Sequence, residues 1–110
     1  MREFTFVGHE DRVACEHLRL GETCKIIGIG NSMLPILKSR QPVICEPVTA
    51  DTPLKKRDIV LCKVNGHYYL HLIHKCSSDD RYLIGNNHGH MNGLVGRSQI
   101  YGKCIEILEA

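Results

Sequence analysis

The dipeptide Asn65-Gly66 constrains the fold of this chain more than any other feature. Residues 58–64 before it and residues 67–73 after it are both rich in apolar, β-branched and aromatic side chains. An Asn-Gly pair between two such runs favours a two-residue turn, because both residues accept the positive φ angles that this turn needs. The sequence therefore predicts a β-hairpin over residues 58–73 and a fold built from paired strands.

Other short runs of strand-forming residues lie on both sides of this hairpin. They are residues 25–29, 42–48, 81–84 and 99–107. The last two runs are separated by residues 85–96, a stretch rich in Gly and Asn that predicts a loop. Short strands at close spacing indicate a mainly β domain with antiparallel strands.

The N-terminal part of the chain predicts one helix, over residues 9–20. Acidic residues occupy its first turn, and Gly21 is a typical stop signal. Its buried side is expected to consist of Val13, Ala14, His17 and Leu18. A short helical turn is also expected over residues 34–37, since proline is tolerated at a helix start.

We divide the chain into an N-terminal segment with the short helix, residues 1–24, and one globular unit, residues 25–110. A chain of 110 residues can bury one modest core. The net charge is only +2, and apart from one short cluster at residues 55–57 the basic residues are scattered. A nucleic-acid partner is therefore not expected, because such proteins normally present a basic face.

No membrane segment or secretion signal is expected. No window approaches the roughly 18 consecutive apolar residues of a transmembrane helix. The N-terminus also lacks the apolar core and small-residue cleavage site of a signal peptide. These features predict a cytoplasmic protein with no integral membrane segment.

Six cysteines are present, none in a C-x-x-C arrangement, and several replace an aliphatic residue within an apolar run. Reduced thiols in the core are a better interpretation than disulfides. Several histidines lie close to Cys76 in the sequence, which suggests a metal site as an alternative. A strand would place His71 and His74 on opposite faces, so neither a metal nor another cofactor is expected.

Ser32 stands where a nucleophile would be placed, between the predicted strand at residues 25–29 and the following turn. A serine hydroxyl needs a base within hydrogen-bond reach before it can attack a carbonyl group. His71, in the predicted strand at residues 67–73, can accept that proton near neutral pH and later return it. The pair predicts a serine peptidase site. The alternative is that Ser32 only caps the turn and His71 is an ordinary core histidine.

Five segments resemble, in order, the sequence boxes of the serine peptidase superfamily that contains LexA-type self-cleaving repressors and type I signal peptidases. They are Gly30-Asn31-Ser32-Met33-Leu34-Pro35, Arg57-Asp58-Ile59-Val60, Leu70-His71-Leu72-Ile73, Gly85-Asn86-Asn87 and Ile100-Tyr101-Gly102-Lys103. The histidine in the third box makes the chain most similar to the archaeal and endoplasmic-reticulum type of signal peptidase, because bacterial members have lysine there. The resemblance extends over about residues 25–108.

This resemblance implies a compact, antiparallel, β-barrel-like domain in which Ser32 is the nucleophile and His71 the general base. Asn86 and Asn92 stand where histidine-type relatives have acids, which makes them candidate orienting residues for the imidazole. An amide can form that hydrogen bond but cannot stabilise imidazolium charge. The candidate substrate-binding residues are Met33, Leu34 and Tyr69.

Two functions are compatible with these features. The first is a small signal-peptidase-like serine endopeptidase that cleaves a specific protein or peptide. The second is a catalytically inactive member of the same fold that binds a protein as a regulator or inhibitor, encoded by a phage or mobile element. The amides in place of acids favour the second function. So does the lack of the membrane anchor and the DNA-binding domain that the relatives have.

Overall fold

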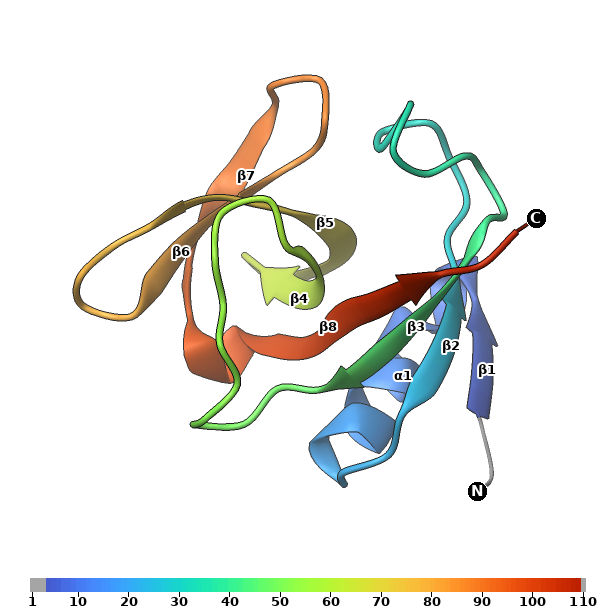
Figure 1. Ribbon diagram of the computed structural model, residues 1–110, viewed down its shortest axis with the longest axis horizontal. Helices are drawn as coiled ribbons and strands as arrows, with labels where there is room; N and C mark the ends of the chain where they lie inside the picture. Colours follow the sequence, from blue (N-terminus) through green and yellow to red (C-terminus); the bar gives the residue numbers. More distant parts are fainter. Residues whose placement is uncertain (1–3, 110) are drawn as a thin grey trace.

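The computed structural model describes residues 4–109. Within these residues the chain forms one α-helix, two 3-10 helices and eight strands, all eight in a single sheet (Figure 1). The elements are β1 (Phe4–Val7), η1 (Gly8–Glu10), α1 (Asp11–Arg19), β2 (Cys24–Ile27), β3 (Pro42–Pro47), β4 (Ile59–Val64), β5 (His67–Cys76), β6 (Arg81–Gly85), β7 (Met91–Gly96), η2 (Arg97–Gln99) and β8 (Ile100–Ile107). The prediction of a mainly β fold with one short N-terminal helix is confirmed.

The strand order is β1-β2-β3-β8-β4-β5-β6-β7, so β8 lies between two groups of strands. It pairs antiparallel with β3 on one side and with β4 on the other. In Figure 1 it links the group β1, β2 and β3 to the group β4 to β7. All neighbouring strands are antiparallel except β1 and β2, which run parallel. Barrel-like closure of the sheet stays a prediction.

The predicted hairpin is present as β4 and β5. Val64 pairs with His67 directly across the turn, and Asn65 and Gly66 have φ angles of 50° and 85°. These positive values are those of a two-residue hairpin turn, which matches the right-handed twist of the strands. β5 continues to Cys76, three residues beyond the predicted end, because its second half pairs with β6.

Two local predictions are corrected, and one strand was not predicted. Residues 85–96 are not all loop, because β7 occupies their second half and pairs with β6. Its Asn and Gly residues have low strand propensity, but pairing with a neighbouring strand outweighs that propensity. The sequence analysis also missed β1. Residues 34–37 form a hydrogen-bonded turn with a cis peptide bond before Pro35, not a helix.

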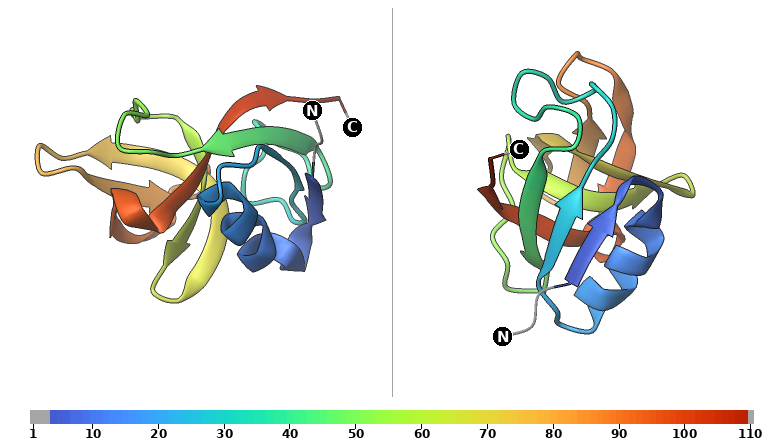
Figure 2. Two further views of the ribbon diagram at one scale, coloured as in Figure 1. Left: turned by 90° about the horizontal axis from the view of Figure 1, so that it is seen from below. Right: turned by 90° about the vertical axis from the view of Figure 1, so that its right-hand side faces the viewer.

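The buried side of α1 also differs from the prediction. Ala14, Cys15 and Leu18 are buried, whereas Val13 is 38% exposed and His17 is only half-buried. The helix lies beside β1 and β2 and against β8 (Figure 2), and positions 14, 15 and 18 fall on one helical face. Gly21 has φ 91° and its N–H donates to the Leu18 carbonyl, as expected of a helix stop.

Two apolar clusters make up the core. The first packs α1 against β1, β2, β3, β4, β5 and the turn after β2, and it includes Leu18, Ile26, Met33, Leu37, Val43, Leu61 and Leu72. The second lies among β4 to β8 and includes Val60, Cys62, Ile73, Tyr82, Ile84, Val95 and Ile100. Since β4 and β5 contribute side chains to both clusters, the position of β5 relative to the turn at Ser32 is fixed by packing on both faces.

The prediction that cysteines lie in the core holds for four of them. Those in residues 4–109 are all free, and four of them are buried: Cys15, Cys24, Cys45 and Cys62. Cys76 departs from the expected pattern because it is exposed at the end of β5. No helix within residues 4–109 is both long enough and apolar enough to cross a membrane.

Candidate active site

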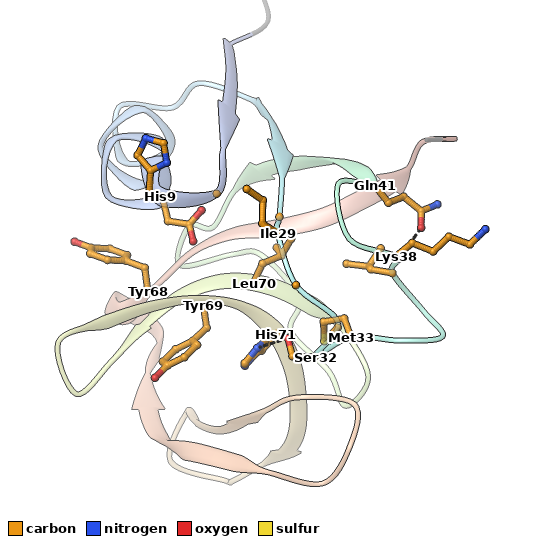
Figure 3. Close-up of a pocket in the computed structure, with 15 residues that line it drawn as sticks. His9, Ile29, Ser32, Met33, Lys38, Gln41, Tyr68, Tyr69, Leu70 and His71 are labelled. Atoms are coloured by element: carbon orange, nitrogen blue, oxygen red, sulfur yellow. Dashed lines mark hydrogen bonds between the residues drawn. The ribbon is translucent and has the colours of Figure 1, made fainter.

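The fold brings Ser32 and His71 together although 39 positions separate them in the chain. Ser32 lies in the turn that follows β2, and His71 lies in the middle of β5. The Ser32 Oγ and the His71 Nε2 are 3.1 Å apart (Figure 3). This distance is within the range in which a base can take the proton of an attacking hydroxyl group.

The second nitrogen of His71 determines which tautomer is present. Its Nδ1 lies 2.7 Å from the Asn92 Oδ1. An amide oxygen only accepts hydrogen bonds, so Nδ1 must hold the proton and donate it. In a neutral imidazole Nε2 is then the free acceptor for the Ser32 hydroxyl. The arrangement therefore has the polarity of a serine–histidine pair with a third, orienting residue.

Asn92 is aimed at His71 by an irregularity in β7. Ile84 pairs with Gly93 and Gly85 pairs with Met91, so Asn92 is the extra residue of a β-bulge. Bulges redirect side chains locally and are common next to functional sites. In a regular strand Asn92 would pair with a residue of β6. Strand periodicity alone therefore could not have predicted that its side chain reaches His71.

Burial and an aromatic neighbour define the surroundings of His71. The residue is only 8% exposed. Tyr69 stacks on its ring, with the ring centroids 4.9 Å apart and an angle of 26° between the planes, as expected for side chains two residues apart on one strand face. Burial lowers the pKa of His71 below its usual value, and the hydrogen bond to Asn92 partly opposes this effect. The imidazole is therefore neutral, and able to act as a base, at neutral pH.

The loop before β7 holds the turn that contains Ser32. The Asn87 N–H donates to the Ser32 carbonyl at 3.0 Å, and the Asn87 Nδ2 donates to the Leu34 carbonyl at 2.8 Å. The His88 Nε2 lies 3.0 Å from the Asn31 carbonyl. Sequence analysis assigned no role to Asn87 or His88. The signal that could have suggested one is the place of Asn87 in the Gly-Asn-Asn box.

Asn86, the other candidate orienting residue, is not a partner of His71. Its Oδ1 accepts hydrogen bonds from the N–H groups of His88 and His90. Its carbonyl oxygen lies 2.8 Å from the His74 Nε2. Asn86 therefore shapes the loop, and of the two asparagines only Asn92 reaches the imidazole.

A cavity of about 590 Å³ opens beside the Ser32–His71 pair. One wall is the first half of β5, whose pairing with β6 begins only at Leu72, so residues 67–71 have one strand edge without a partner strand among the described residues. The opposite wall is formed by residues 28–30, which continue from β2. A strand edge of this kind offers backbone donors and acceptors to an extended peptide.

The candidate substrate-binding residues are placed in different ways. Tyr69 and Met33 both line this cavity, and Met33 is also part of the first core cluster. Leu34 does not line it; its carbonyl accepts the hydrogen bond from Asn87. The backbone N–H groups of Ser32 and Met33 donate to no acceptor within residues 4–109, which makes them candidate donors to a developing oxyanion.

The buried thiols are poor candidates for a nucleophile. Burial raises the pKa of the thiols of Cys15, Cys24, Cys45 and Cys62 above the usual value, which keeps them protonated and unreactive. Across the described part of the chain, no three side chains of His, Cys, Asp or Glu are grouped closely enough to hold a metal ion.

No protein-family model matches the sequence, and a search of curated proteins finds no significant match.

Proposed function

We propose that this protein is a serine endopeptidase of the LexA and type I signal peptidase superfamily, of the histidine type. The observation that supports this most is the 3.1 Å contact between the Ser32 Oγ and the His71 Nε2, with Asn92 on the far side of the imidazole. The order of the five sequence boxes supports it independently, because two of them supply the two members of the pair.

The reaction begins when the Ser32 oxygen attacks the carbonyl carbon of a peptide bond. His71 takes the hydroxyl proton on Nε2 as the new C–O bond forms. The N–H groups of Ser32 and Met33 stabilise the negative oxygen of the tetrahedral intermediate. His71 then returns the proton to the leaving amine as the C–N bond breaks. Water hydrolyses the resulting acyl-enzyme by the same steps, with His71 again as the base.

The cavity is suited to an extended peptide substrate. The free edge of β5 at residues 67–71 can pair with a substrate strand, which would then pass directly beside His71. Residues 28–30 would lie on the other side of that strand and lead into the Ser32 turn. The cavity runs along β5 from His71 towards the start of the strand, away from the part of β5 that pairs with β6. It can therefore hold several substrate residues next to the cleaved bond, which supports an endopeptidase.

Asn92 limits the rate that we expect. It keeps the correct tautomer of His71 but supplies no negative charge to stabilise the imidazolium that forms during attack. We therefore expect a slow, specific enzyme rather than a general digestive protease. The alternative function, a protein-binding regulator without activity, is favoured by this same residue.

The test is reaction of the purified protein with a fluorophosphonate probe at pH 6 to 9, measured by intact mass. We expect one probe per molecule, located at Ser32 by peptide mapping. Ser32→Ala should abolish labelling, and His71→Ala should slow it by at least about a hundredfold, since base catalysis typically contributes 10²–10⁴-fold.

Ser98→Ala is the matched control, because Ser98 is an exposed serine remote from the cavity. This variant should be labelled like the wild type. Absence of labelling in the wild type, or equal labelling of Ser32→Ala, would contradict the proposed activity. Capture of a binding partner by the unlabelled protein would then support the regulator.

A further inference from the structure

The cavity extends well beyond the Ser32–His71 pair. Figure 3 shows His9 and Tyr68 at one end of it, Lys38 at the other, and Ile29 and Leu70 between these ends. The first end is built by η1 and by the first turn of α1, two elements outside the region of the sequence boxes. We name this end, lined by His9, Asp11 and Tyr68, the α1 end of the cavity.

Asp11 is the acidic residue of the α1 end. It lines the cavity and is half-buried, yet its carboxylate has no hydrogen bond or ion pair within residues 4–109. Three of the four other half-buried carboxylates have a partner, and the fourth, Glu46, does not line the cavity. Glu10 accepts from the Val7 N–H, Glu22 contacts His17, and Asp58 contacts Lys103.

An unpaired carboxylate in this position is costly to the free protein. Burial raises the pKa of Asp11 to about 6, which shows that the surroundings disfavour its charge. At neutral pH it is nevertheless ionised. A position in the first turn of α1 is favourable for an acid, but that interaction does not require the side chain to line a cavity. A cation entering the cavity would supply the missing partner.

We propose that Asp11 binds a basic side chain of the peptide substrate, Lys or Arg, at a position several residues from the bond that is cleaved. This inference rests on the proposed peptidase function, and it names a feature of the substrate that the Ser32–His71 pair does not determine.

The charge distribution of the cavity gives this contact a direction. Lys38 also lines the cavity, at the end remote from His9. A basic side chain of the substrate is therefore repelled at the Lys38 end and attracted by Asp11 at the α1 end. Arg and Lys also have long apolar stems that can lie along Ile29 and Leu70 while the charge reaches Asp11. A partly buried ion pair of this kind is expected to improve binding about tenfold.

The experiment uses two acetylated, amidated peptide libraries that are identical except that one contains Lys and Arg and the other contains norleucine and Gln instead. Acetylation removes the N-terminal amine, which is the other source of a cation. Cleavage by the wild type, Asp11→Asn and Glu16→Gln is measured by mass spectrometry. Glu16→Gln is the matched control, because Glu16 is an exposed acid on the same helix that does not line the cavity.

We expect the wild type and Glu16→Gln to prefer Lys or Arg about tenfold at one position. In Asp11→Asn that ratio should fall towards one. A wild type that cleaves both libraries equally, or an Asp11→Asn variant that keeps the preference, would overturn the role of Asp11 while leaving the peptidase function intact.

A failure of the peptidase function would be seen differently, as no cleavage of either library. Binding is then measured by affinity selection of the same libraries on Ser32→Ala and on Ser32→Ala with Asp11→Asn. Enrichment of Lys and Arg only by the protein that retains Asp11 would support the cation site. No enrichment, or the same enrichment by both proteins, would overturn it.

Discussion

At the scale of single residues, the pairing of Ser32 with His71 could be predicted from the sequence, but the partner of the second imidazole nitrogen could not. Ser32 and His71 were identified from their position next to a turn and within a strand. Asn86 and Asn92 were equivalent candidates, and only the β-bulge distinguishes them, since it turns Asn92 towards the imidazole. A bulge depends on how two strands pair, which the residues of one strand do not encode.

The first prediction concerns Asn92. In Asn92→Asp a carboxylate replaces the amide oxygen that accepts from His71 Nδ1, so it stabilises the imidazolium formed during attack. We expect the rate of peptide cleavage or of probe labelling to rise about tenfold, which corresponds to about 1.4 kcal/mol of transition-state stabilisation. Rates at saturating and at limiting probe concentration measure the change.

The pH dependence provides a second readout of the same variant. Burial places the pKa of wild-type His71 below its usual value of 6.5, so the rate should fall only on the acid side of that value, where the base becomes protonated. The added carboxylate should move the midpoint of this fall to higher pH. Asn92→Ala, which lacks any acceptor, should be slower than the wild type. Equal rates and equal midpoints in all three proteins would show that Asn92 does not orient His71.

At the scale of elements, residues 86–90 are more than a connection between β6 and β7. Asn87 and His88 contact the carbonyl groups of Asn31, Ser32 and Leu34, and so hold the turn that contains Ser32 in place. The sequence analysis predicted one long loop here, because Asn and Gly have low propensity for strands. Hydrogen bonds between distant segments cannot be deduced from such local propensities.

The second prediction follows from this loop. Asn87→Ala removes the side-chain hydrogen bond to the Leu34 carbonyl, so the Ser32 hydroxyl is held less accurately against His71. We expect the rate of Ser32 labelling to fall at least about tenfold, because small misplacements at a reacting group have large effects. The free energy of unfolding should fall by only about 1 kcal/mol. Labelling kinetics and urea unfolding followed by circular dichroism measure the two effects.

Gln99→Ala is the matched control, since the Gln99 Nε2 donates to the Lys63 carbonyl at 3.2 Å, away from the cavity. It should lower stability by a similar amount and leave labelling unchanged. If Asn87→Ala and Gln99→Ala reduced labelling equally, Asn87 would have only a structural role.

At the scale of the whole molecule, α1 and β8 meet at Gly102, where the side chain of any larger residue would clash with neighbouring side chains. A Cβ atom on Gly102 would lie 2.8 Å from the Leu18 Cδ1 and 3.1 Å from the Cys45 Cβ. Gly102 belongs to the Ile-Tyr-Gly-Lys segment that was noted as a box in the sequence. The structure gives the physical reason for a glycine there: the helix packs directly on the backbone of the central strand.

The third prediction tests this packing. Gly102→Ala should lower the free energy of unfolding by about 1–3 kcal/mol, the usual effect of overpacking a core. Gly96→Ala is the matched control, because a Cβ atom at Gly96 would have no neighbour within 4 Å and its φ of −84° suits any residue. It should change stability by less than about 0.5 kcal/mol. Equal unfolding midpoints for the two variants in urea would show that α1 can move away from β8 without loss.

The central place of β8 also affects when the sheet can be completed during synthesis. β8 follows every other strand of residues 4–109, yet it is the strand that joins the group of β1, β2 and β3, which flanks the Ser32 turn, to the group that contains His71. While a ribosome is still translating residues 100–107, the two groups have no shared strand. We therefore expect the complete sheet, with Ser32 and His71 held against each other, only after residues 100–107 have emerged from the ribosome.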